Sequence, residues 1–275
     1  MGTSDFDRES TLELIGLSND IPTLPDRFIR IQRILDDPNA GIDDLTEVIH
    51  TDQATCAMIL KVANSTAYNP SGKPTSTLRL AVSRLGSREV SHIALTMSLM
   101  FGFALPMGMA HVRAFWIHAF STAIIAEKLA LRVGYKDGRE AFMAGLLHDI
   151  GRAMMGLRVD LAYFESPLVH LHDEDLIAAE REHYGLDHAD AGGHTLTLWH
   201  FPPKLIQAVA EHHRDDSTDM LTRIIRTACQ LSNEHIPNGA HIEGIPPLLH
   251  EAMPGILTPE LVSDFTSALE TTAGH

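Results

Sequence analysis

The chain has 275 residues, of which 44% are hydrophobic and 21% charged, and this composition excludes a disordered or collagen-like protein. Its formal net charge of −15 disfavours nucleic acids and anionic membrane surfaces as partners. The sequence contains 2 cysteines and an N-terminal segment without an apolar core, so we expect a cytoplasmic protein without a disulfide framework.

Apolar residues recur at helical spacing along the chain, and no long alternation of apolar and polar residues indicates a strand. The sequence therefore predicts an all-α fold. Its N-terminal helices are expected at residues 25–35, 42–49, 51–64, 77–85 and 87–101. Further helices are expected at residues 112–133, 139–155, 173–184, 188–199, 203–213, 220–233 and 259–271.

A break at residues 106–108 separates these two groups of helices and favours a subdomain boundary there. We expect an N-terminal tail at residues 1–17, a helical subdomain at 18–108 and a second helical subdomain with a C-terminal extension at 109–275.

One uncharged stretch, residues 93–110, reaches the 18 residues of a minimal membrane span. Polar residues, two glycines and Pro106 interrupt it. A buried helix that ends near Pro106 is the favoured interpretation, and we expect no membrane association.

The composition includes 17 histidines, and the most informative of them is His148, which directly precedes Asp149 at the end of an apolar helix. An imidazole and a carboxylate are both good ligands for a divalent metal ion. The small residues Ala141, Ala144 and Gly145 share the helix face of His148 and would allow a close approach. An adjacent His-Asp pair alone is weak support for a site.

Three other segments of the sequence strengthen the hypothesis of a metal site. Each of them puts an imidazole on or next to the buried face of a predicted helix. Together with the first pair they make a set of six residues from four helices: His118, His148, Asp149, His188, His212 and His213. Such nitrogen and oxygen ligands suit one or two divalent transition-metal ions, for example iron, manganese, zinc or nickel.

The order His, His-Asp, His and His-His on consecutive helices resembles the HD phosphohydrolase superfamily. Several other motifs narrow the resemblance to the HDOD family, the HD-related output domain of bacterial signalling proteins. These motifs are IPTLP at 21–25, LKVANS at 60–65, AVSRLG at 81–86, GLLHDIG at 145–151, DHADAG at 187–192 and WHFPP at 199–203. The resemblance covers roughly residues 18–235.

This resemblance implies an all-helical fold in which an N-terminal bundle packs on an HD-like domain. By similarity to the related HD-GYP phosphodiesterases, one metal position would be formed by Asp149, His188, His212 and His213. A second position would use His118, His148 and Asp149, with the carboxylate bridging the two ions. Asp149 would then be central to catalysis, and Arg152 would pair with a substrate phosphate, unless it is only a surface residue near a helix end.

The sequence also departs from the pattern of the active enzymes. Ala114 stands where a further Glu would precede the first histidine, and Cys229 replaces the last Asp of the superfamily. No Gly-Tyr-Pro motif follows His213. For Cys229 we favour a small buried residue over a thiolate ligand.

The remaining polar candidates are interpreted as structural. Glu180 fits the family pattern but is expected to be a hydrogen-bond acceptor, and five histidines lack a matching motif position, namely His170, His172, His183, His194 and His200.

Three functions remain open. The leading hypothesis is a regulatory HDOD module with an HD-type metal site that acts on a signalling protein partner or a nucleotide ligand. The second is an active metal-dependent phosphohydrolase or phosphodiesterase on a nucleotide or cyclic dinucleotide, and the third is a metal-free helical interaction scaffold.

Overall fold

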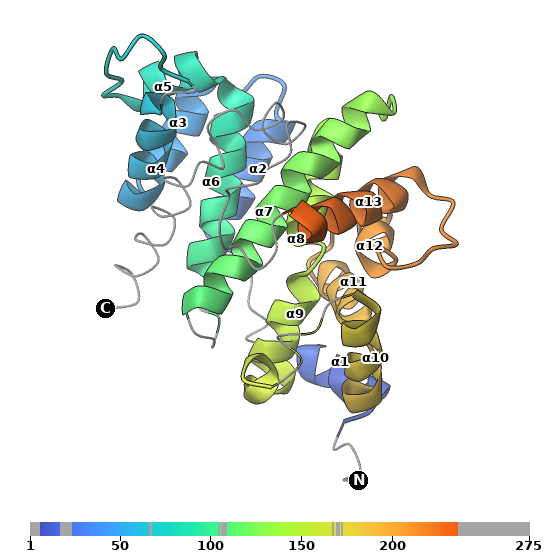
Figure 1. Ribbon diagram of the computed structural model, residues 1–275. Coiled ribbons are helices and arrows are strands. Elements are labelled where there is room, and N and C mark those ends of the chain that lie inside the picture. Colours follow the sequence, from blue (N-terminus) through green and yellow to red (C-terminus); the bar gives the residue numbers. More distant parts are fainter. Residues whose placement is uncertain are drawn as a thin grey trace. The chain divides into compact units, whose positions relative to one another are not determined.

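The structure is a computed structural model, and it describes residues 6–16, 24–65, 68–103, 105, 109–166, 168, 171 and 173–235 (Figure 1). Every regular element in these residues is a helix, which confirms the predicted all-α fold. The described residues fall into two compact units. We call residues 24–103 the N-terminal unit, and residues 6–16 together with 105–235 the histidine unit.

The N-terminal unit contains five helices among its described residues, close to the predicted ranges. They are α2 (Asp26–Asp36), α3 (Ile42–His50), α4 (Gln53–Asn64), α5 (Leu78–Leu85) and α6 (Ser87–Gly102). Side-chain caps fix two of the starts: Asp52 accepts a hydrogen bond from the Ala54 amide before α4, and Thr77 accepts one from the Leu80 amide before α5. Gly86, with φ of 88°, allows the sharp turn between α5 and α6.

Helix α6 contains most of the uncharged stretch that has the length of a membrane span. Every side chain from Val90 to Met100 is buried within the protein, so α6 is a core helix. Among the described residues, one helical segment, Ala114–Arg132, is long and apolar enough to cross a membrane. It too is mostly buried, as the central helix of a globular unit would be.

The histidine unit is built around the long helix α7 (Met109–Arg132), which packs against α8 (Gly138–Leu147) and α13 (Met220–His235) (Figure 1). Helix α11 (His188–Leu198) packs between α9 (Ile150–Met154) and α12 (Pro203–Ala210). The remaining elements are α1 (Arg8–Gly16), the π-helical turn η1 (Met155–Val159), the 3-10 turn η2 (Leu161–Phe164) and α10 (Asp173–Tyr184).

Three features of this unit differ from the sequence-based expectations. Residues 8–16, expected in a tail, form helix α1, which packs against α11 and η1. The single helix expected at residues 139–155 is interrupted at His148 and Asp149, and α9 starts after this break. The helix expected at 203–213 ends at Ala210, which leaves His212 and His213 in a turn. The predicted helix at 259–271 and the predicted break at 106–108 lie outside the described residues.

Candidate metal centre

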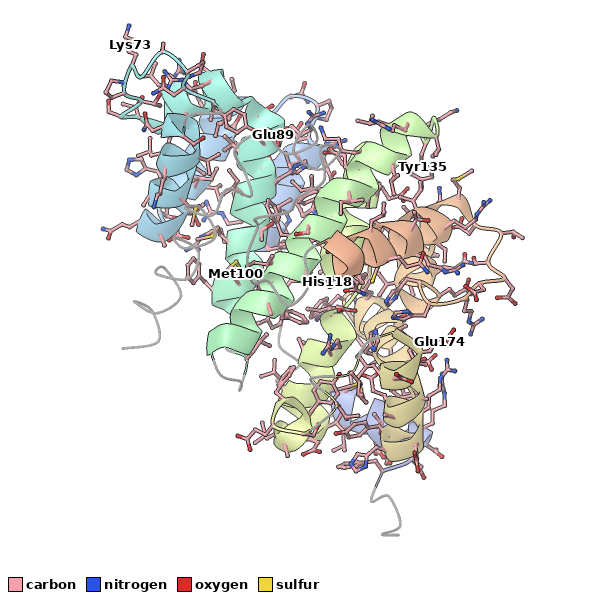
Figure 2. All side chains as sticks on the ribbon, in the orientation of Figure 1. Lys73, Glu89, Met100, His118, Tyr135 and Glu174 are labelled. Carbon is pink, nitrogen blue, oxygen red and sulfur yellow. The ribbon has the colours of Figure 1, made fainter. Side chains whose placement is uncertain are left out.

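Four parts of the histidine unit bring the six predicted residues together. Helix α7 carries His118, which Figure 2 labels, and the break between α8 and α9 carries His148 and Asp149. His188 is the first residue of α11, whose start is capped by the Asp187 side chain. The turn after α12 supplies the remaining pair, His212 and His213.

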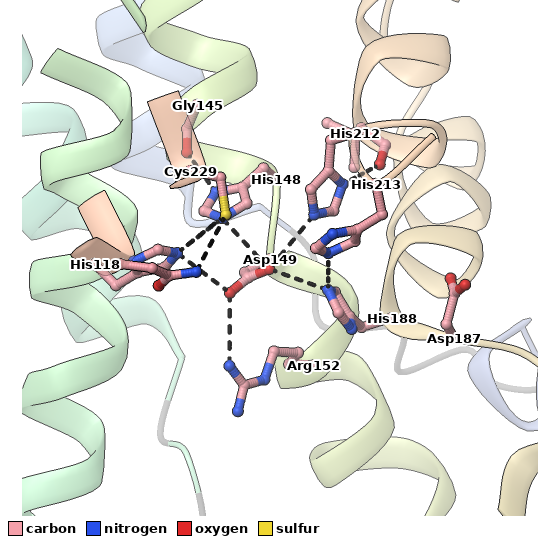
Figure 3. Close-up of polar contacts among 12 residues, drawn as sticks. His118, Gly145, His148, Asp149, Arg152, Asp187, His188, His212, His213 and Cys229 are labelled. Carbon is pink, nitrogen blue, oxygen red and sulfur yellow. Dashed lines mark hydrogen bonds and ion pairs between the residues drawn. The ribbon is translucent and has the colours of Figure 1, made fainter. Parts of the chain in front are cut away.

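Asp149 lies at the centre of these imidazoles (Figure 3). Its Oδ1 is 3.4 Å from the Nε2 atoms of His148 and His188, and 3.8 Å from Nε2 of His212. Its Oδ2 is 3.9 Å from Nε2 of His118. One carboxylate therefore reaches imidazoles from four separate parts of the chain.

Hydrogen bonds at Nδ1 orient the rings of His148 and His212 so that their Nε2 atoms face Asp149. The Nδ1 atoms of His148 and His212 lie 2.8 Å and 2.7 Å from the carbonyl oxygens of Gly145 and Val209. A carbonyl oxygen only accepts, so Nδ1 of each ring carries the proton. In the neutral rings the Nε2 atoms then present lone pairs, which is how proteins orient histidine ligands toward a metal.

The electrostatics of the rings support this description. Burial lowers the pKa of His148 to about 3, and burial together with the nearby His188 lowers that of His212 to about 4. Both imidazoles are therefore neutral and able to coordinate near pH 7. The Nε2 atom of His212 is buried and has no hydrogen-bond partner among the described residues. A lone pair buried without a partner is costly, so a bound cation would satisfy this atom.

His188 has a different environment, because the carboxylate of Glu180 on α10 contacts the ring nitrogen that faces away from Asp149. Glu180 Oε2 lies 2.7 Å from His188 Nδ1, while Glu180 Oε1 accepts a hydrogen bond of 2.5 Å from the Tyr163 hydroxyl. Burial disfavours the charged imidazole, but the Glu180 carboxylate outweighs it and raises the pKa of His188 to about 9. Glu180 is thus the expected hydrogen-bond acceptor, and it orients a residue of the cluster.

Asp149 is kept ionised by its neighbours. Burial alone would raise its pKa, but its electrostatic interactions with His148, His188 and Arg152 lower that pKa well below the usual range. Arg152, whose Nη1 lies 3.7 Å from Oδ2 of Asp149, has a side chain only 16% exposed. It therefore faces the centre of the cluster rather than the solvent (Figure 3).

Small residues allow the helices to approach this closely. A Cβ atom added to Gly145 would lie 2.7 Å from the backbone of Ala123 on α7. One added to Gly151 would lie 1.9 Å from the carbonyl oxygen of His188. The two glycines thus fix the distances from α8 to α7 and from α9 to α11, and with them the positions of the ligand atoms.

Two groups near His118 come from α13. The Sγ atom of Cys229 lies 3.7 Å from Nε2 of His118, and the hydroxyl of Ser232 lies 3.1 Å from its Nδ1. Neither Ser232 nor Tyr163 is among the candidates that the sequence indicates. The three-residue spacing of Cys229 and Ser232, which puts them on one face of a helix, was the available signal for the first, and no pattern marks the second.

Three of the five histidines without a matching motif position are among the described residues. His183, His194 and His200 do not join the groups of ligand atoms that could hold a metal ion. His170 and His172 lie outside the described residues.

A cavity of about 430 Å³ borders the cluster on one side. His212, His213 and Cys229 line it together with acidic residues of α10 and with Arg226. This cavity gives an ion or a small ligand a route to the imidazoles.

The fold and this histidine-aspartate centre define an all-helical protein of the HD-related type. The chain belongs to the HDOD domain family, whose model matches residues 21–215. An uncharacterized protein of Treponema pallidum is 27% identical over an alignment of 205 positions, which covers 71% of this chain and 38% of that protein. The chain thus spans about two fifths of the length of this curated relative.

Two solved structures show the same fold. An HDOD domain protein of unknown function from Geobacter sulfurreducens is similar with a TM-score of 0.67 and 23% identity, over 98% of this chain and 97% of that one. A protein from Shewanella amazonensis, provisionally described as a phosphohydrolase, is similar with a TM-score of 0.62 and 20% identity, over 95% of this chain and 94% of that one.

Proposed function

We propose that this chain is a bacterial regulatory HDOD module whose histidine unit binds one or two divalent transition-metal ions. The observation that carries the proposal is the convergence of four imidazole Nε2 atoms on the buried carboxylate of Asp149. Histidine and aspartate ligands in this combination suit iron, manganese, zinc or nickel.

The ligands divide into two groups around the shared carboxylate. His188, His212 and His213 have ligand atoms within 4.8 Å of one another, and they would hold one ion together with Asp149. His118 and His148, whose Nε2 atoms are 3.1 Å apart, would hold a second ion on the other side of Asp149. A carboxylate between two cations neutralises part of their charge and fixes their separation.

Family membership and the departures from the active enzymes support a regulatory role. Ala114 offers no carboxylate to the centre, and the chain after His213 lacks a Gly-Tyr-Pro motif. In this proposal the metal stabilises the histidine unit, and the module acts on a signalling protein or a nucleotide in the cytoplasm. Neither nucleic acids nor membranes are partners in this proposal.

Metal binding is tested by comparing the thermal unfolding of metal-free and metal-loaded protein. A ligand that binds only the folded state adds about 2.7 kcal/mol to the free energy of unfolding when its concentration is 100-fold above Kd. We expect zinc or manganese to raise the melting temperature of the wild type and to leave that of Asp149→Ala unchanged. An identical melting temperature with and without metal in the wild type would favour the metal-free scaffold instead.

A specific observation favours phosphohydrolase activity as the second candidate. The guanidinium of Arg152 lies beside Asp149, and the adjoining cavity is open to a small ligand. When bound, a divalent ion lowers the pKa of a water molecule and supplies a nucleophile near neutral pH. Arg152 would hold a phosphate by charge-assisted hydrogen bonds.

Hydrolysis of bis(p-nitrophenyl) phosphate with manganese or iron tests this candidate. Activity is expected to disappear in Asp149→Ala and to fall in Arg152→Met, which retains the bulk of the side chain without its charge. Turnover by the wild type no faster than by Asp149→Ala would exclude the phosphohydrolase and leave the regulatory metal site unaffected.

A further inference from the structure

Cys229 lies against two of the proposed ligands rather than in a purely apolar core. Its side chain belongs to α13, and its Sγ atom lies 3.7 Å from Nε2 of His118 on α7. The ligand atoms of Cys229, His118 and His148 all lie within 4.8 Å of one another. Three segments, namely α7, the break between α8 and α9, and α13, therefore bring one sulfur and two imidazole nitrogens to one point.

The distances within this group match those between ligands of a single ion. In a tetrahedral zinc site with the usual bond lengths, two nitrogens are about 3.3 Å apart, and a nitrogen and a sulfur are about 3.6 Å apart. The observed separations are 3.1 Å between Nε2 of His118 and Nε2 of His148, and 3.7 Å between Sγ and Nε2 of His118. Small adjustments would bring all three atoms into coordination.

Asp149 lies next to both imidazoles and would supply a fourth donor. Its Oδ1 lies 3.4 Å from Nε2 of His148, and its Oδ2 lies 3.9 Å from Nε2 of His118. Together with Cys229, the group offers two nitrogens, one oxygen and one sulfur. This is a complete set for a tetrahedral ion, whereas His118, His148 and Asp149 alone would be one ligand short.

The surroundings of Cys229 suit a metal-bound thiolate. Asn233, one turn further along α13, points its amide nitrogen at Sγ from 3.9 Å, and N–H donors of this kind accompany metal ligands in proteins. The Ser232 hydroxyl contacts Nδ1 of His118, the side of the ring away from the sulfur. Cys229 also lines the cavity that borders His212 and His213, so an ion can reach it.

We propose that the Cys229 thiolate is a metal ligand, and that with His118, His148 and Asp149 it forms a zinc-preferring site next to the position formed by His188, His212 and His213. The inference rests on the proposed metal centre and specifies the chemistry of one of its two positions. A thiolate selects borderline and soft ions such as zinc over manganese or magnesium. The chain would therefore bind zinc where a carboxylate in place of Cys229 would favour a harder ion.

Cobalt(II) titration followed by absorption spectroscopy tests this assignment, because a cobalt–thiolate bond gives a charge-transfer band in the near ultraviolet. The wild type is compared with Cys229→Ser. The matched control is Cys56→Ser, because Cys56 is the other of the 2 cysteines in the chain. We expect the band in the wild type and in Cys56→Ser. In Cys229→Ser we expect its loss, while the visible bands of cobalt bound at the histidine position remain.

The possible results separate this inference from the metal centre itself. Cobalt binding by the wild type without a charge-transfer band, or an undiminished band in Cys229→Ser, would overturn the thiolate ligand and leave the metal centre standing. A wild type that binds no cobalt would overturn both.

A second variant, Cys229→Asp, covers the case in which the serine variant fails to fold. It replaces the sulfur with a carboxylate, so we expect the affinity for zinc relative to manganese to fall by at least about tenfold. An unchanged ratio would contradict the proposal.

Discussion

Glu180 holds His188 by two hydrogen bonds, one from the ring and one from the backbone. Its Oε2 atom lies 2.7 Å from Nδ1 of His188 and 2.9 Å from the His188 amide nitrogen. The ring is thereby fixed with Nε2 toward Asp149, at 3.4 Å. Because Glu180 comes from α10 and His188 from α11, this pair also connects α10 to the centre.

Replacing this carboxylate is expected to weaken metal binding without removing a ligand. Loss of a residue that hydrogen-bonds to a metal ligand typically lowers metal affinity by about 10–100-fold. We therefore expect Glu180→Gln to lower the affinity for zinc by about that factor. Isothermal titration with zinc measures the change. Glu182→Gln is the control, because Glu182 is an exposed residue of the same helix. Equal affinities in both variants would show that Glu180 has no orienting role.

The same pair makes metal binding dependent on pH. His188 has a pKa raised to about 9, so it carries a proton near pH 7 that coordination must displace. His148 and His212, with pKa values near 3 and 4, are already neutral there and release no proton when they coordinate through Nε2.

We therefore expect the ion at the position of His188 to release about one proton when it binds near pH 7, and its affinity to rise with pH until about 9. Calorimetry in two buffers of different ionisation enthalpy measures the release. Affinity that is constant between pH 6 and 8 would contradict this prediction.

The composition of the centre could be predicted from the sequence, whereas its geometry could not. The six proposed ligands are identifiable because each lies next to small or apolar residues at helical spacing, where an imidazole needs a partner. The break at His148 and Asp149 gave no signal, since apolar residues continue at helical spacing through Met155. That break depends on the packing of α9 against α11, which involves residues about 40 positions apart and leaves no local pattern.

This close packing leads to a third prediction. A methyl group at Gly151 would lie 1.9 Å from the His188 carbonyl oxygen, so α9 and α11 would have to separate. We expect Gly151→Ala to destabilise the protein by about 1–3 kcal/mol, as overpacking usually does, and to weaken metal binding. Urea unfolding measures the stability.

The control for this substitution is Gly16→Ala at the end of α1. A Cβ atom there would meet nothing closer than 3.7 Å. It should therefore leave both stability and metal affinity close to those of the wild type. A stability of Gly151→Ala equal to that of this control would show that the close approach of α9 to α11 is not required.

The central claim, that the histidine unit binds transition-metal ions around Asp149, is tested most directly by the metal content of protein purified without added metal. Elemental analysis measures this content in the wild type, Asp149→Asn and Asp43→Asn. Asp43 is a surface carboxylate of the N-terminal unit and serves as the control. We expect about one or two transition-metal ions per chain in the wild type and in Asp43→Asn, and a large loss in Asp149→Asn. A wild type without metal even after incubation with zinc, manganese and iron, or an Asp149→Asn variant with the same content, would contradict the account.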